Sequence, residues 1–553
     1  MLLDTTDFPD DHEIRADIII VGAGAAGITM ALDLIGSKQS VLLFESGGLE
    51  EEPATQHLYA GAVVNARLHS PPDRYRQRRL GGTTTIWGGR CMPLDPIDFE
   101  VRDYVPGSGW PIIYTDVEPF YARANALCEA GAFAYTTDAT FGPAALPIVA
   151  GFTSPDYSTH RLERFSCPTN FAARYGHKLR GRHNVQVVLH ANLTQIVLDE
   201  NGTQVRQLLL RTLSGKRLTA RGGRYVLATG GLEAARLLLA NRDRHPRGIG
   251  NQHDIVGRYY MCHVAGTIGA IQFACPTSAV YRGYRMSPEG VYCRQRFSLE
   301  ESAQRREGIG SFIARLHHPR ITDPAHRSAI LSLLYLAKPL IPYEYQQRLH
   351  GADGNSPGDW LRHVTNVVTG PVEAASFTWH MVRDRMLAER KFPSIIINSK
   401  ANLYSIDFHA EQYPNAASRV LLDDTVDALG MPRIKIDWRY LPEDVHTVSR
   451  ALEILARDFA ASGVGRLHYD PALVETEITR YGAYGGHHIG TARMGSDPRS
   501  SVVDANCRVH AVNNLYVAGS AVFPTSSQAN PTLTIVALAL RLAAHLSRME
   551  ALR

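Results

Sequence analysis

The chain has few cysteines and none of the groupings that cysteine chemistry requires. Seven cysteines are spread over 553 residues, and no two of them form a CxxC pair or a CxxCH haem-attachment motif. Iron–sulfur clusters need grouped thiolates, so a site of that kind is excluded. We expect reduced, mostly buried thiols and no metal site.

Strong net charge and long apolar runs are also missing. Lys and Arg number 58 against 54 Asp and Glu, and without a long basic stretch nucleic-acid binding has no electrostatic support. The longest apolar stretch, Ser328 to Tyr343, is interrupted by Lys338, Pro339 and Pro342 and is too short and broken to span a bilayer. The N-terminus is acidic where a signal peptide would be basic. We therefore expect a cytoplasmic protein.

The composition that is present is that of a folded protein with two domains. Hydrophobic residues make up 44% and charged residues 20% of the chain, as in ordinary globular proteins. A length of 553 residues exceeds what one core supports. Regular patterns at both ends flank a less regular middle, which predicts a discontinuous nucleotide domain (14–100, 181–250 and 482–553) and a substrate domain (101–180 and 251–481).

A strand–helix–strand unit opens the chain. The pattern predicts a strand over 18–21, a glycine turn, a helix over 28–35 and a strand over 40–44. The turn carries GxGxxG at Gly22, Gly24 and Gly27, and Glu45 closes the second strand. Such glycines permit a tight turn, approach of a pyrophosphate and close helix packing. A carboxylate at Glu45 binds ribose hydroxyls and repels a 2′-phosphate, which favours FAD or NAD over NADP.

Further segments predict the rest of this sheet. A strand over 224–228 leads into a helix over 232–239, and short strands are expected between 185 and 198. Near the C-terminus, a strand over 515–518 and a loop precede a helix over 531–547. In the middle of the chain, 403–412 and 434–438 alternate in polarity as strands do.

Two more motifs accompany the glycine turn. Leu80 to Gly89 reads LGGTTTIWGG, a loop of small residues that can bring backbone amides against a flat, electron-accepting ring. The C-terminal part contains HHIGTARMG from His487, VD at Val503, NLYVAGSAVFP from Asn514 and ANP from Ala529. Together these motifs resemble the glucose-methanol-choline (GMC) oxidoreductases, flavoenzymes that oxidise alcohols. The resemblance runs from about residue 15 to 550 and is loosest in the central third.

The resemblance implies a fold, a cofactor and two active-site residues. It implies an α/β fold with a Rossmann-like FAD-binding domain and a discontinuous substrate domain, built on a mostly antiparallel sheet covered by helices. The His of the HxxGT segment, the base of the family, falls on His487, and the second active-site residue falls on Asn530. GWPI at 109–112 and YVAGSAVFPT at 516–525 resemble the sugar- and polyol-oxidising branch, that of pyranose oxidases and sugar dehydrogenases.

The resemblance also indicates how FAD is held. Ile86 stands where some members attach FAD through a His, so we expect non-covalent FAD, and Gly519 stands where many members have Asp. The residues expected to contact the cofactor lie in or beside the motifs: Gly22, Gly24, Ala25, Ala26, Gly27, Glu45, Ser46, Gly81, Gly82, Thr83, Thr84, Trp87, Gly88, Gly89, Leu193, Ala228, Gly519, Ser520, Asn530, Pro531 and Thr532.

In alcohol oxidation by a flavin, a base removes the hydroxyl proton and the carbon passes a hydride to flavin N5. The site therefore needs a base and an orienting group at the same carbon. His487 suits the base because imidazole titrates near neutral pH, and His488 is its rival. Asn530 suits the orienting role. It also precedes Pro531, which predicts a helix N-cap, so its two roles compete. The positive end of that helix would face the flavin. We interpret His263 as structural.

Substrate contacts are expected from the central domain. Alternation along 403–412 puts Asp407, His409 and Glu411 on one face, which suits either hydroxyl recognition or a solvated outer surface. The candidate substrate residues are Glu411, Gln412 and His488. Trp87 and Trp110 are each expected either to stack on a sugar or to lie in the core.

The leading hypothesis is FAD-dependent oxidation of a CH–OH group on a sugar, glycoside or polyol. The alternatives are a non-sugar (aromatic, aliphatic or sterol) alcohol, or a catalytically silent flavoprotein subunit. An NAD-dependent dehydrogenase would explain GxGxxG alone but not the other motifs. The sequence leaves open whether oxygen, a quinone or a redox protein takes the electrons, and whether a small partner subunit exists.

Overall fold

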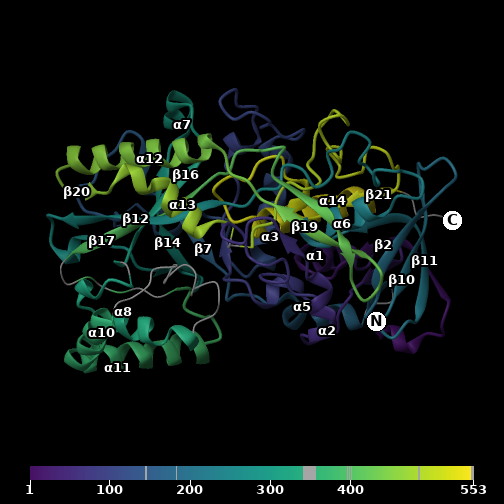
Figure 1. Cartoon of the computed structure of the whole chain (residues 1–553), viewed down its shortest axis with the longest axis horizontal. Helices are drawn as coiled ribbons and strands as arrows, with labels where there is room; N and C mark the ends of the chain where they lie inside the picture. Colours follow the sequence, from purple (N-terminus) through teal and green to yellow (C-terminus); the bar gives the residue numbers. More distant parts are fainter. Residues whose placement is uncertain are drawn as a thin grey trace.

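The computed structural model describes residues 1–143, 146–181, 184–319, 321–340, 357–394, 397, 399, 402–483 and 486–549. Two sheets organise the two ends of its long axis (Figure 1). The apolar stretch 328–343 contains α8 (Ala329–Leu336), and its last three residues lie outside the described part. No described helix is both long and apolar enough to cross a bilayer. All seven cysteines are free and five are buried, which confirms the expected state of the thiols.

One end is built on a largely parallel sheet in the strand order β1, β8, β3, β2, β11, β10, β9, and β21 pairs with β11. The pairs are parallel except β11 with β10 and β10 with β9. The strand bounds are β1 Leu2–Asp4, β2 His12–Val21, β3 Val41–Phe44, β8 Val185–Leu189, β9 Asn192–Leu198, β10 Val205–Arg211, β11 Arg217–Leu227 and β21 Leu515–Val517. The strands predicted from apolar runs are thereby confirmed.

Helices follow the strands as the sequence predicts. α1 (Ala25–Asp33) follows β2 and α6 (Gly230–Ala240) follows β11. α14 (Thr532–Ser547) packs against α1 and α3 (Glu118–Leu127). α1 begins earlier than expected because Gly27 lies within the helix, and α14 begins one residue later.

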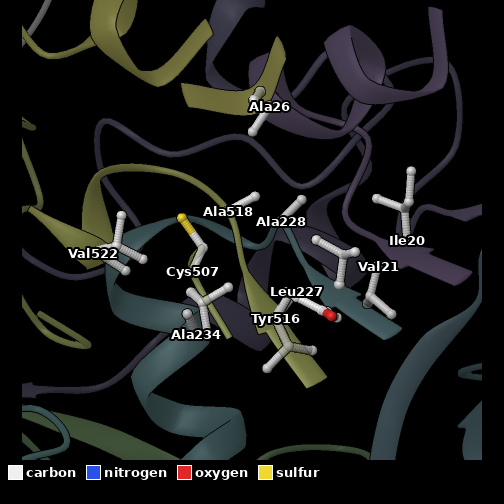
Figure 2. Packing of buried hydrophobic residues seen from close by; sticks show 14 of the residues in the cluster. Ile20, Val21, Ala26, Leu227, Ala228, Ala234, Cys507, Tyr516, Ala518 and Val522 are labelled. Atoms are coloured by element: carbon white, nitrogen blue, oxygen red, sulfur yellow. The ribbon is translucent and has the colours of Figure 1, made fainter. Parts of the chain in front are cut away.

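Apolar residues from distant segments form the core beneath the strand ends (Figure 2). The backbone amide of Ala228, after β11, donates to Val21 of β2 at 2.8 Å. The amide of Ala518, after β21, donates to Leu227 at 2.8 Å. Through these backbone bonds, three strands that are far apart in the sequence end side by side.

The other end is built on an antiparallel sheet in the order β20, β12, β17, β16, β15, β6. α12 (Pro442–Ala461) and α13 (Val474–Tyr481) share its core. In Figure 1, α12 lies above the sheet and α8, α10 (Pro357–Thr369) and α11 (Pro371–His380) lie below it. This confirms the predicted antiparallel sheet with covering helices. Its strands are β6 Tyr157–Ser158, β12 Val264–Phe273, β15 Phe297–Leu299, β16 Phe312–His317, β17 Leu403–Ala410 and β20 Gly465–His468.

Two small sheets connect these parts. One contains β5 Arg90–Cys91, β7 Leu162–Phe165, β13 Arg285–Met286 and β14 Tyr292–Gln295, and the other β4 Ala62–Val63, β18 Arg419–Val426 and β19 Pro432–Asp437. The β18–β19 hairpin falls in the predicted substrate domain, but Val420, Ile434 and Ile436 pack with the core of the parallel sheet. The domain boundaries stay a prediction. Among the described residues, the remaining α-helices are α2 Pro53–Gln56, α4 Thr137–Phe141, α5 Phe171–Arg180 and α7 Glu301–Glu307.

Candidate active site

The GxGxxG turn joins β2 to α1. Two of its glycines lie against backbone atoms that leave no room for a side chain, and the third has free space beside it. A Cβ on Gly22, whose φ is +100°, would lie 2.6 Å from the carbonyl oxygen of Ala228, and one on Gly27 would lie 1.9 Å from that of Gly22. Gly24 differs, because no other described atom lies within 4 Å of its Cβ position. Gly24 also occupies the N-cap position of α1. The open face of the turn therefore lies at a helix N-terminus, where backbone amides bind phosphate.

Glu45 ties the turn to the strand beside it. It is 5% exposed, and burial raises the pKa of its carboxyl group. One oxygen accepts from the amide of Ala23 at 2.9 Å and the other from that of Gly47 at 3.0 Å and from the hydroxyl of Ser46 at 3.1 Å. Its carbonyl accepts from Ala191 at 2.9 Å, shortly before β9. These bonds hold the carboxylate beside the GxGxxG turn.

The predicted flavin loop crosses over this turn. A Cβ on Gly82 would lie 2.9 Å from Cα of Gly24, and φ is positive at both Gly81 and Gly82. Thr84 fixes the loop by accepting from the amide of Phe171 at 3.1 Å. Trp87 donates to the carbonyl of Thr169 at 2.9 Å. The two motifs were predicted separately from the sequence. The structure brings them into contact at Gly82 and Gly24.

The C-terminal motif lies beside the start of α6. Ser520 donates to the carbonyl of His488 at 2.7 Å, and a Cβ on Gly231 would lie 2.3 Å from that carbonyl oxygen. Gly519 has a φ of +117°. Neither Gly519 nor Gly88 has another described atom within 4 Å of its Cβ position.

The residues present fit a dinucleotide cofactor. Gly24, Gly88 and Gly519 leave space where a side chain would stand, and the N-terminus of α1 is beside the first of them. One oxygen of Asn530, Oδ1, is buried without a hydrogen-bond partner among the described residues. A buried acceptor of this kind favours a bound group that can donate to it.

His487 and Asn530 form the candidate catalytic pair. Nδ2 of Asn530 lies 3.0 Å from Nε2 of the half-buried His487. The competing N-cap role is not seen, because Pro531 occupies the N-cap position of α14 and no side chain caps that helix. The amide of Asn530 is therefore directed at the candidate base.

A third histidine, which the sequence prediction took as structural, completes this group. The segment 487–490 pairs antiparallel with 260–263, through a bridge between Met261 and Ile489. His263 therefore lies beside His487, with its Nδ1 2.6 Å from Nδ1 of His487. It is 5% exposed, and burial lowers its pKa to about 4. No local sequence pattern indicates this contact, since the two residues are 224 positions apart.

His488 points to the opposite side of the paired segments. Its Nδ1 lies 2.7 Å from the hydroxyl of Tyr260, which lies 2.8 Å from Nε2 of His69. Burial lowers the pKa of His488 well below its usual value. The structure thus favours His487 over His488 as the base, because His487 contacts Asn530.

The back of the paired segments contains a set of side chains with metal-ligand chemistry. Ligand atoms of His69, Cys262 and His488 lie within 4.8 Å of one another. The Tyr260 hydroxyl, however, is 2.8 Å, 3.4 Å and 2.7 Å from these three atoms in that order. Because it contacts all three, a hydrogen-bonded network explains the cluster.

The candidate substrate residues of the central domain are engaged by neighbours. Glu411 is 0% exposed, and its two oxygens accept from Arg102 at 2.6 and 2.8 Å. Gln412 accepts from the amide of Cys262 at 2.7 Å and from the indole of Trp438 at 3.0 Å. These bonds favour a supporting role over direct contact with a substrate hydroxyl.

The polar face of β17 is buried, so the solvated alternative is wrong for most of it. His409 is 3% exposed, and its ring centroid lies 5.9 Å from that of His263. Asp407 binds Arg315 at 2.6 Å. Trp110 is 8% exposed and packs against Phe523, as the core alternative predicts.

Comparisons with known proteins agree with this architecture. Residues 414–539 match the family model described as GMC oxidoreductase. Paromamine 6′-oxidase from Streptomyces fradiae is 24% identical over 97% of this chain and 92% of that protein. The fructose dehydrogenase large subunit from Gluconobacter japonicus is 24% identical over 96% and 98%.

A solved structure shares the fold. Pyridoxine 4-oxidase from Mesorbium loti superposes with a TM-score of 0.54 at 19% identity, covering 96% of this chain and 98% of that one. The family match, two relatives aligned over nearly their whole length and a common fold point to one assignment. The C-terminal part of this chain, residues 414–539, matches the GMC oxidoreductases, and nearly the whole chain is similar to oxidoreductases that act on CH–OH groups.

Proposed function

We propose that this protein binds FAD non-covalently and oxidises a CH–OH group of a sugar, glycoside or polyol, with His487 as the base. The observation that carries this proposal is the contact between Nε2 of His487 and the amide of Asn530 at 3.0 Å. The names of two relatives, an oxidase of paromamine and a dehydrogenase of fructose, support the substrate class.

The cofactor residues follow from the geometry of the two glycine motifs. The α1 N-terminus with Gly24 would hold the pyrophosphate, Glu45 the ribose, and the loop from Gly81 to Gly89 the ring. Ile86 is 51% exposed and has no group for a covalent link. The side chain of Ile86 therefore supports a dissociable flavin.

A substrate hydroxyl that replaces the direct contact between His487 and Asn530 can be oriented by both side chains. It donates its proton toward Nε2 of His487, which acts as general base, and accepts a hydrogen bond from Nδ2 of Asn530. The two bonds fix the position of the carbon that bears the hydroxyl. A bound FAD would supply the hydride acceptor for this carbon.

Substitution of the base tests the proposal. His487→Ala should keep its flavin but reduce it about 10²- to 10⁴-fold more slowly with substrate, the usual contribution of a general base. His488→Asn is the matched control, because Asn keeps an atom near the Nδ1 position that contacts Tyr260, and its flavin should be reduced at nearly the wild-type rate. Anaerobic stopped-flow absorbance measures both rates. A normal rate in His487→Ala would show that another group is the base.

Oxygen, a quinone and a redox protein are the candidate electron acceptors. One relative is named a large subunit, which supports a search for a small partner subunit. The cytoplasmic location stays a prediction.

A further inference from the structure

We propose that His263 is a positioning residue that fixes the tautomer of His487, leaving the proton on Nδ1 and the lone pair on Nε2. The proposal rests on the proposed role of His487 as the base. It assigns a function to a histidine that the sequence analysis interpreted as structural.

A backbone carbonyl group determines which ring nitrogen of His263 carries a proton. Nε2 of His263 lies 3.2 Å from the backbone oxygen of Ser526. A carbonyl oxygen only accepts hydrogen bonds, so Nε2 of His263 carries a proton and donates it. The protonation of the other ring nitrogen, Nδ1, then decides what His487 does.

Burial keeps His263 neutral. Its pKa is lowered to about 4, chiefly by burial, and a neutral imidazole with a proton on Nε2 has a lone pair on Nδ1. That lone pair lies 2.6 Å from Nδ1 of His487. Two lone pairs at this distance would repel each other, so Nδ1 of His487 must be the donor.

The other nitrogen of His487 is then an acceptor. The neighbour of Nε2 is the amide of Asn530 at 3.0 Å, and with Nδ2 on this side it donates. The same orientation leaves Oδ1 of Asn530 without a partner among the described residues. All contacts along Ser526, His263, His487 and Asn530 are therefore consistent with one set of proton positions.

This arrangement has two consequences for the base. The lone pair on Nε2 accepts from the amide of Asn530, and a substrate hydroxyl that replaces this amide can donate to the same lone pair. When Nε2 takes a proton, the imidazolium keeps its Nδ1 hydrogen bond to His263, which stabilises the added charge. Without His263, the proton of His487 is free to move to Nε2, and the side chain then cannot act as a base.

The tautomer can be measured without activity. In purified holoenzyme labelled with ¹⁵N-histidine, two-bond ¹H–¹⁵N spectra distinguish protonated from unprotonated ring nitrogens. The signals of His487 are those that vanish in His487→Gln. In the wild type we expect Nδ1 of His487 to be protonated. In His263→Leu the proton of His487 should shift toward Nε2. His263→Asn should keep the wild-type form, because Oδ1 of Asn can accept near the original Nδ1 of His263.

Tyr260→Phe is the matched control. Tyr260 lies on the same segment but contacts His488 on its other side, so removal of its hydroxyl should leave the His487 spectrum unchanged. A wild-type His487 protonated at Nε2 would overturn the proposal, as would an unchanged tautomer in His263→Leu. The wild-type spectrum decides even if His263→Leu fails to fold.

Kinetics gives a second readout. His263→Leu should lower the limiting rate of flavin reduction roughly 10- to 100-fold, the effect of losing one hydrogen bond to a charged group. KM should change little, and His263→Asn should recover most of the rate. An equal loss in His263→Asn and His263→Leu would contradict the positioning role. If the tautomer is as expected but no alcohol reduces the flavin, the proposed function fails and the positioning role stands.

Discussion

Glu411 offers a sharp test between recognition and support. The sequence pattern made it a candidate for binding substrate hydroxyls, whereas the structure places it against Arg102 with both side chains 0% exposed. It also accepts from the amide of Ser311 at 3.1 Å. We expect Glu411→Ala to destabilise the protein and to leave KM for substrate close to the wild-type value.

The magnitude follows from what the substitution leaves behind. Without Glu411, the guanidinium of Arg102 is buried without its carboxylate, which costs about 3–5 kcal/mol. A chain of 553 residues unfolding as one unit has an unfolding entropy of about 1.2 kcal/mol/K, so Tm should fall by about 3–4 °C. Replacing both partners, as in Arg102→Met with Glu411→Leu, should recover part of this loss because no buried charge remains unpaired.

Calorimetry and steady-state kinetics together give the answer. Glu100→Ala is the matched control, since it breaks the exposed pair of Glu100 with Arg305, each 45% exposed, and exposed pairs contribute about 0–1 kcal/mol. A Glu411→Ala protein with unchanged Tm and a strongly raised KM would refute the supporting role. It would then favour direct recognition of substrate by this carboxylate.

Three further outcomes follow from the structure. Because the Cβ position of Gly24 is open, Gly24→Ala should leave the Tm of flavin-free protein unchanged, but it should lower flavin occupancy, measured by absorbance. Gly27→Ala should prevent normal folding, since its Cβ would lie 1.9 Å from the carbonyl oxygen of Gly22. Acid precipitation should release all flavin into the supernatant, because Ile86 cannot bond to it, and a coloured pellet would contradict this. Burial raises the pKa of Asp98 to about 8. The folded state therefore keeps a proton that the unfolded state loses above about pH 4, and the free energy of unfolding falls as the pH rises from about 4 to 8. Denaturant titrations should show Asp98→Asn to be less sensitive over this range, and equal slopes for both proteins would refute it.

The parts of the site that could be predicted from sequence depend on short spacings. GxGxxG, Glu45 and the HxxGT segment each specify a local conformation, and the strands predicted from apolar runs recur in the structure. β2 shows the limit of this signal. It begins at His12 rather than 18, because its first residues pair with β11 through backbone hydrogen bonds. Buried and exposed side chains are mixed in this part of the strand, so it has no apolar run to detect.

The rest of the site depends on contacts between distant segments. His263 contacts His487, which is 224 positions away in the sequence, and Arg102 contacts Glu411, which is 309 positions away. The sequence pattern put Glu411 on a polar face but carried no information on which charge would face it. Asn530 is a similar case, since the ANP pattern fits a helix cap equally well and only the position of His487 settles where the amide points.

The most direct test of the account is the visible absorption spectrum of the purified protein, recorded without oxygen before and after addition of sugars, glycosides, polyols and simple alcohols. We expect the two-banded absorption of an oxidised flavin, and we expect sugars and polyols to bleach it. A protein that takes up no flavin even when FAD is added would contradict the cofactor site. A bound flavin that only non-sugar alcohols bleach would contradict the substrate class.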